Sequence, residues 1–299
     1  MPQLSPRQLV VLVLLTLIWG LNWPVMKLGV ADIAPLTFRM LSFWLGLPFL
    51  ALVLLQRGES FVIPRAWWPR VVLLTVVNMV VWHALMILAI PLLSSGRAAI
   101  LGYTMPIFSA VIGSLFFGDR LAGRGWVGVL AAAIGVLLLL WNEMAALGAS
   151  ALGVVLMLTS AASWALGTQL LRRLHVPVQL LTLSFWMVAL TCVVLTALAL
   201  AFEHSRWHMP GLPAAAAVLY NGVLALAFAQ VAWFFLARTL PPVASTLSVM
   251  LIPVIGVFSG ALWLGEVLRW QDWTAVALMM LAIASVLWPA DGKKQSNQA

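Results

Sequence analysis

Charged side chains are scarce in this sequence. Only 8% of the 299 residues are Asp, Glu, Lys or Arg, and 64% are hydrophobic, whereas a soluble globular protein carries about 25% charged residues. This composition excludes a soluble globular domain. Apolar runs of about 20 residues, long enough to cross a hydrocarbon core of ~30 Å as a helix, occur at 8–29, 35–56, 68–91, 94–117, 124–142, 150–172, 178–202, 213–237, 242–265 and 271–289. The sequence therefore predicts an all-α integral membrane protein with ten transmembrane helices.

Signatures of enzymes and of cofactor sites are also missing. The sequence has no G-x-x-x-x-G-K-[ST] loop, no H-E-x-x-H and no close pair of carboxylates. Its single cysteine, Cys192, falls within a predicted span and cannot form an intramolecular disulfide. We therefore expect no catalytic residue, no metal and no cofactor.

Basic residues exceed acidic residues by 16 to 8, and their placement points to membrane topology rather than to a nucleic-acid partner. With the N-terminus in the cytoplasm, eleven Lys and Arg residues fall on the cytoplasmic side and four on the other side, with Arg39 inside a span. The connecting loops are short, so the positive-inside rule applies. We expect a multi-pass protein of the inner (plasma) membrane with both termini cytoplasmic.

Two stretches about half a chain apart resemble each other. MPIFSAVIGSLFFGDRL at 105–121 returns as IPVIGVFSGALWLGEVL at 252–268, with the shared pattern P-x₆-G-x₄-G-[DE], and WGLNWPVMK at 19–27 resembles WALGTQLLR at 164–172. The offsets of 147 and 145 residues predict a duplicated chain, with repeats at 1–147 and 148–299. Because each repeat holds an odd number of spans, the second repeat is expected to be inverted in the membrane relative to the first.

The first helix of each repeat carries aromatic candidates for a binding site. Trp19 and Trp23 share a face of the first predicted helix with Asn22 beside them, and Trp164 takes the place of Trp19 in the second repeat. Gly167 stands where the first repeat has Asn22, so we expect an asymmetric site. Such side chains either line a cavity or pack between helices and at the membrane interface, and both interpretations remain open.

The third and fourth helices add further polar and aromatic candidates. Asn78 and Trp82 share a face at i,i+4 spacing, with His83 next to them, and Tyr103 lies in the fourth span. An interhelical hydrogen bond explains Asn78 without any functional role. Ionisable residues inside membranes are rare, which favours a functional role for His83. Tyr103 needs a hydrogen-bond partner or a wet cavity.

Two cations are candidate charge partners of a substrate. Arg39 follows the start of the second predicted helix by four residues, close to the outer boundary, where its side chain is expected to snorkel into the headgroup region. If it points inward instead, its guanidinium can bind a carboxylate through two parallel hydrogen bonds. Lys27 is expected to supply a similar charge nearby.

Ten predicted spans, the WGLNWPVMK opening and the repeated P-x₆-G-x₄-G-[DE] pattern resemble the EamA family of drug/metabolite transporters. The tryptophan-rich character and the region of the third helix further resemble YddG-type exporters of aromatic amino acids. The resemblance implies two inverted five-helix repeats, with helices 1–4 and 6–9 around a central cavity and helices 5 and 10 outside it. It also implies a secondary carrier, most often an exporter.

On this basis we expect a monomeric carrier that exports amino acids, aromatic or other apolar ones, by alternating access. No Asp or Glu lies inside a predicted span away from its ends, so transport is expected to be facilitative or weakly linked to protons through His83. Nucleobases, lipophilic cations and sugar derivatives are the alternative substrates. A membrane sensor or a membrane enzyme is disfavoured by the missing output domain and the missing catalytic constellation.

Overall fold

The computed structural model describes residues 5–119, 123–145, 150–239 and 242–287, and every regular element in these ranges is helical. The ten predicted spans are present. The first two are α1 (Pro6–Val30) and α2 (Pro35–Gln56), the third is a rod of η1 (Arg65–Trp67), α3 (Trp68–Leu74), η2 (Thr75–Val80), α4 (Val81–Ala89) and η3 (Ile90–Leu92), and the fourth is a rod of α5 (Ser95–Gly102) and α6 (Met105–Phe117). The fifth, sixth and seventh are α7 (Gly123–Ala145), α8 (Ser150–Arg173) and α9 (Leu180–Glu203), which is continued by η4 (His204–Arg206). The eighth is a rod of α10 (Leu212–Leu219), η5 (Tyr220–Phe228) and α11 (Ala229–Thr239), and the last two are α12 (Pro242–Leu264) and α13 (Trp270–Leu287).

Length and apolar composition suit these helices to a bilayer. Seven helical rods within the described ranges are long and apolar enough to cross a membrane, and shorter apolar stretches cover 123–138 and 251–264. Proline stands at the first or second position of several helices, where its missing N–H costs nothing. Three glycines with positive φ follow helix ends, where a left-handed residue ends the helix: Gly58 (64°) after α2, Gly118 (72°) after α6 and Gly265 (65°) after α12.

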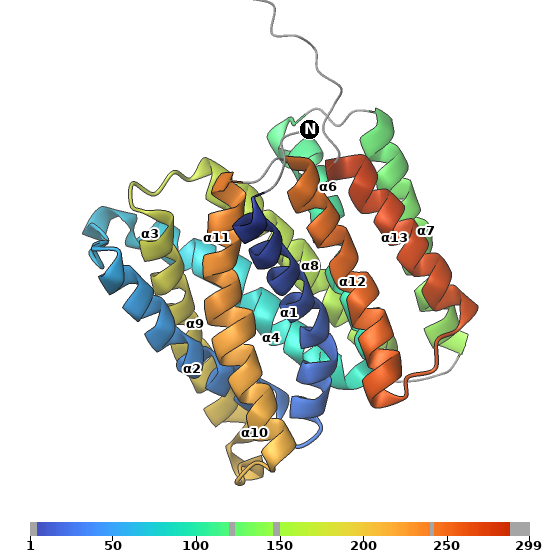
Figure 1. Ribbon diagram of the computed structural model, residues 1–299, viewed down its shortest axis with the longest axis horizontal. Helices are drawn as coiled ribbons and strands as arrows, with labels where there is room; N and C mark the ends of the chain where they lie inside the picture. The colour runs from blue at the N-terminus through green and yellow to red at the C-terminus, as the bar shows by residue number, and fades with distance from the viewer. Residues whose placement is uncertain (1–4, 120–122, 146–149, 240–241, 288–299) are drawn as a thin grey trace, which may run out of the picture.

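The first helix of each repeat packs mainly against helices of the other repeat. Helix α1 packs against α12 and against α10, η5 and α11, whereas its counterpart in the second repeat, α8, packs against α4, α5 and α6. Helices α2 and α9 pack together on one side of the bundle, and α7 and α13 form a pair on the other side (Figure 1). The peripheral place expected for the fifth and tenth helices is therefore confirmed.

Three of the rods are interrupted, which the apolar pattern did not predict. The third and eighth rods contain π-helical turns, η2 and η5, and the fourth rod breaks between Gly102 and Met105 ahead of Pro106, which cannot donate a backbone hydrogen bond. The two π-helical turns hold Asn78 and Asn221, which lie 143 residues apart and correspond in the two repeats. Wide turns of this kind are frequent at functional sites.

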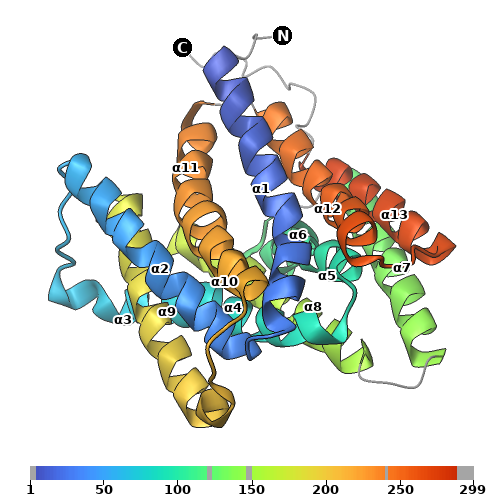
Figure 2. The same ribbon diagram turned by 60° about the horizontal axis from the view of Figure 1, so that its bottom comes forward.

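We call the end of the bundle that holds Ser5 the near face and the opposite end the far face. The connections α1–α2, η3–α5, η4–α10 and α12–α13 lie at the far face, which is at the bottom of Figure 1 and is turned toward the viewer in Figure 2. The charge bias of the sequence predicts that the far face is external.

Candidate functional site

A row of four polar side chains crosses the interior of the bundle. Asn221 on η5 donates from Nδ2 to Oδ1 of Asn22 on α1 at 2.6 Å, and its own Oδ1 accepts from Nη1 of Arg39 on α2. Nη2 of Arg39 in turn contacts Nδ1 of His83 on α4. We call these residues the polar chain. It joins four helices from both repeats, and three of its members are less than 9% exposed.

Arg39 is the one cation of the polar chain. Its side chain is 6% exposed, so the expectation that it snorkels to the membrane surface is wrong. Besides Asn221 and His83 it contacts the sulfur of Met26 at 3.8 Å and lies over the ring of Phe43 at 5.3 Å. All of these partners are neutral or aromatic. Its Nε has no hydrogen-bond partner among the described residues.

The donor pattern fixes the state of the imidazole in this contact. A guanidinium only donates, so Nδ1 of His83 accepts and the ring proton is on Nε2. The ring also stacks edge-on against Phe43, with 4.7 Å between the centroids. A second proton on His83 would place two cations against each other in a site shielded from water. The arrangement therefore suits a neutral His83.

Asparagines in the two π-helical turns make related contacts. Asn78 donates from Nδ2 to the backbone carbonyl of Trp164 at 3.1 Å, whereas Asn221 donates to the side chain of Asn22. Gly167, the counterpart of Asn22, leaves no space for a side chain, because an added Cβ would lie 2.5 Å from Cβ of Asn78. The two repeats thus differ at this position, with close backbone packing in the second repeat and an amide pair at Asn22 in the first.

Two aromatic pairs include residues that neighbour the polar chain in the sequence, Trp82 before His83 and Trp23 after Asn22. Trp82 lies next to His83 in the chain and packs against Trp164 of α8, with ring centroids 5.6 Å apart. Trp23 of α1 packs edge-on against Tyr103 of the fourth rod at 6.3 Å. The first pair joins the two halves of the protein, and the second joins two helices of the first half. Trp23, Trp82 and Tyr103 are buried.

The structure places the remaining predicted site residues elsewhere. Trp19 faces the eighth rod, where it donates to the carbonyl of Ala225 and packs against Trp233. Lys27 points to the far face and binds main-chain carbonyls there. The candidate that sequence reasoning missed is Asn221, whose correspondence to Asn78 could have revealed it.

The chain matches the EamA-like transporter family over residues 7–141 and 151–288. It belongs to this family. The fold is accordingly that of two inverted five-helix repeats, and the two matched ranges are consistent with the duplication read from the sequence.

Several relatives are transporters by name. The chain is 26% identical over 255 residues to the uncharacterized transporter YoaV of Bacillus subtilis, covering 84% of this chain and 86% of the relative. It is 28% identical over 276 residues to the uncharacterized inner membrane transporter YedA of Escherichia coli K12, covering 91% and 88%. A third relative, also from Escherichia coli K12, is named "Probable amino-acid metabolite efflux pump". This chain is 25% identical to it over 291 residues, and the alignment covers 94% of both chains.

A solved crystal structure has the same fold. It aligns with a TM-score of 0.67 and 19% identity, covering 94% of this chain and 96% of the other. The protein is thus a multi-pass membrane protein of a transporter family.

Proposed function

We propose that this protein exports amino acids with aromatic or other apolar side chains across the inner membrane, and that Arg39 binds the substrate carboxylate. The observation that carries the proposal is a buried guanidinium whose contacts are all to neutral groups. A buried charge is expensive unless it is paired. A carboxylate that forms two parallel hydrogen bonds with Arg39 would supply the missing partner.

The groups around Arg39 suit the rest of an amino acid. The amide oxygens of Asn22 and Asn221 accept hydrogen bonds from an ammonium group, and Trp82 with Trp164 offers aromatic surface to a side chain. Stacking or cation–π contact with such rings contributes about 0.5–2 kcal/mol. The name of the E. coli efflux-pump relative agrees with this substrate class.

The polar chain also disfavours lipophilic cations as substrates, because Arg39 would repel a second positive charge in the same site. A neutral His83 beside Arg39 supports facilitative transport over proton-linked transport. Orientation with both termini in the cytoplasm, which the charge bias predicts, completes the proposal.

The test is uptake of labelled Phe, Trp, Met and Thr into proteoliposomes, with and without a pH gradient. We expect saturable uptake without a pH step, competition by unlabelled phenylalanine and weak competition by phenethylamine, which lacks the carboxylate. Arg39→Gln should reduce uptake by about tenfold or more, the loss of one charge-assisted contact, and should abolish the preference for phenylalanine over phenethylamine.

Arg57 supplies a matched control. It follows the same helix, α2, but is exposed, so Arg57→Gln should leave both uptake and the preference unchanged. If all four amino acids enter at the rate of empty liposomes, the substrate assignment fails, and nucleobases and sugar derivatives become the next probes.

A further inference from the structure

At the far face, the connection between the third and fourth rods is bound from two sides. Lys27 at the end of α1 donates from Nζ to the carbonyls of Ile90 and Pro91 at 3.0 and 3.1 Å, and also to that of Leu93. These carbonyls lie at the C-terminal end of a helical rod, where the helix dipole favours a cation. Lys27 thus attaches α1 to η3.

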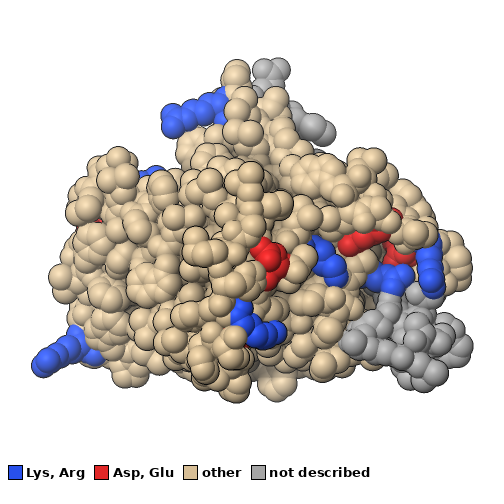
Figure 3. Space-filling model, turned by 90° about the horizontal axis from the view of Figure 1, so that it is seen from below, with Lys and Arg blue, Asp and Glu red and all other residues tan. Residues whose placement is uncertain are grey.

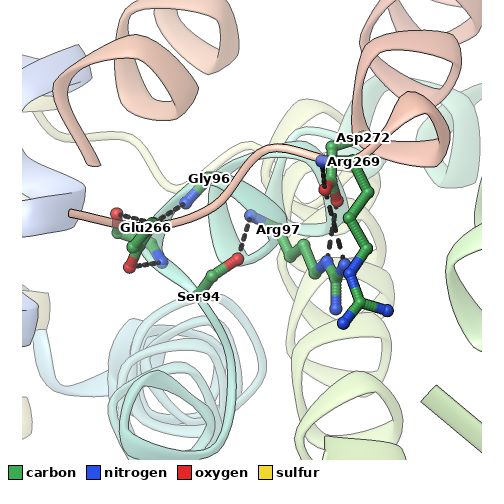
Figure 4. Close-up of polar contacts among 7 residues, drawn as sticks. Ser94, Gly96, Arg97, Glu266, Arg269 and Asp272 are labelled. Carbon is green, nitrogen blue, oxygen red and sulfur yellow. Dashed lines mark hydrogen bonds and ion pairs between the residues drawn. The ribbon is translucent and has the colours of Figure 1, made fainter. Parts of the chain in front are cut away.

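A carboxylate side chain binds the other end of the same connection, at the start of α5. Glu266, just past α12, accepts from the backbone N–H of Ser95 at 2.7 Å and of Gly96 at 3.4 Å, and from Oγ of Ser95 at 2.8 Å (Figure 4). These donors lie in the first turn of α5, where the dipole favours an anion. Glu266 thus attaches α12 to α5. We call the contacts of Lys27 and Glu266 together the far latch.

The corresponding carboxylate of the first repeat is used differently. Asp119 and Glu266 both follow a left-handed glycine, and their backbone N–H groups both return to the glycine six residues earlier. Yet Asp119 binds Arg173 at the end of α8, with N–O distances of 2.9 Å, and its side chain is half exposed.

The far latch lies beside a hollow in the far face. The hollow has a volume of about 340 Å³ and is lined by both charged residues, by Pro91 and by apolar residues of α1 and α12. Acidic and basic side chains lie next to one another on this face (Figure 3). Water in such a hollow can solvate the two charges once they leave the main chain.

We propose that the far latch is the gate through which substrate leaves on the far side. Lys27 and Glu266 hold the outer ends of α1 and α12 against the η3–α5 connection in the conformation described above. For release, both residues exchange their main-chain partners for water in the hollow, and α12 parts from α5. Asp119, bound to α8, is not engaged in this contact. The inference rests on the transport that the family shows and not on amino acids being the cargo.

The test measures how readily a reagent reaches the interface beneath the far latch, so it requires no substrate. Ala99 of α5 is fully buried, and a Cβ added at Gly256 of α12 would lie 2.8 Å from Cβ of Ala99. Ala99→Cys is placed in a Cys192→Ala background, and intact bacterial cells are treated with a membrane-impermeant maleimide. Met209→Cys, at a loop residue that is 91% exposed, marks the far face and reports its sidedness.

We expect Glu266→Gln to accelerate labelling of Cys at position 99 by about tenfold or more, as the loss of a charged acceptor for three donors implies. Lys27→Gln is a second, independent variant and should act in the same direction. Asp119→Asn is the matched control, because it removes the same charge from the same motif position without touching α5, and its labelling should stay close to that of the parent.

Equal labelling rates in Glu266→Gln, Lys27→Gln and Asp119→Asn would overturn the proposal. Size-exclusion chromatography in detergent identifies any variant that has not folded. Failure of amino-acid uptake leaves this result unaffected, so the two proposals fail separately.

Discussion

The close approach of α8 to η2 at Gly167 gives a quantitative prediction. An ideal Cβ at Gly167 would lie 2.5 Å from Cβ and 2.6 Å from Cα of Asn78. Because one of these atoms is backbone, no rotamer change relieves the overlap, and the two helices must separate by about 1 Å to restore contact distance. The substitution Gly167→Ala therefore acts on the packing of two helices and not on one side chain.

Three free-energy terms decide the sign of the effect. Overpacking costs about 1–3 kcal/mol. Separation also weakens the 3.1 Å hydrogen bond from Asn78 to the carbonyl of Trp164, a loss of about 1 kcal/mol. Replacing a helical glycine by alanine returns about 1 kcal/mol. Gly167→Ala should thus lower the free energy of unfolding by roughly 2 kcal/mol.

Gly135 of α7 is a suitable control, because it is also a buried glycine inside a helix. A Cβ there would meet its nearest neighbour, Cβ of Leu278, at 3.5 Å, which is ordinary contact. Gly135→Ala should therefore stabilise the protein by about 0.5–1 kcal/mol. Thermal unfolding in detergent measures both variants. A rise in melting temperature for Gly167→Ala similar to that of Gly135→Ala would refute the packing argument.

Three further predictions concern other parts of the molecule. Asn221→Leu should destabilise the protein by about 3 kcal/mol, since it removes a partner of Arg39 and one of Asn22, and thermal unfolding of the double variant with Arg39→Met should show that the two losses are not additive. Gly118→Ala should cost about 1 kcal/mol, because φ is 72° with open space around the Cα, and Gly118→Asn should cost less in the same assay. Hydrogen bonds to the backbone carbonyls of Met209 and Asp32 raise the pKa of His208. Its small contribution to thermal stability should therefore be complete below about pH 6.5 and disappear as the pH rises through the raised pKa. This pH dependence should be absent in His208→Gln.

The spans were predictable because lipid imposes a strict condition on the backbone. A segment in hydrocarbon must satisfy its own hydrogen bonds, so an apolar run of sufficient length folds as a helix whatever its neighbours are. The seventh run, predicted at 178–202, is observed as Leu180–Glu203. The π-helical turns η2 and η5 were not predictable in this way, because the apolar pattern of a lipid-facing helix continues through them unchanged.

The candidate site was predictable in its residues but not in its connections. Asn22 and His83 were singled out by their polarity, and the structure brings both into the polar chain. The direction of Arg39 depends on Asn221, which lies 182 residues away in the sequence. No local pattern reports such a partner, and only the comparison of Asn78 with Asn221 in the two repeats could have suggested it.

The repeated glycine–carboxylate motif shows what duplication determines and what it leaves open. In both repeats the first glycine makes room for the returning carboxylate: a Cβ at Gly113 would lie 2.6 Å from Oδ2 of Asp119, and one at Gly260 would lie 2.5 Å from Oε2 of Glu266. The motif therefore dictates the same local turn twice. Among the described contacts, Asp119 of the first repeat binds Arg173 of α8, and Glu266 of the second repeat binds the first turn of α5. Each carboxylate thus binds a helix of the other repeat, so the duplicated turn joins the two halves of the bundle at both faces.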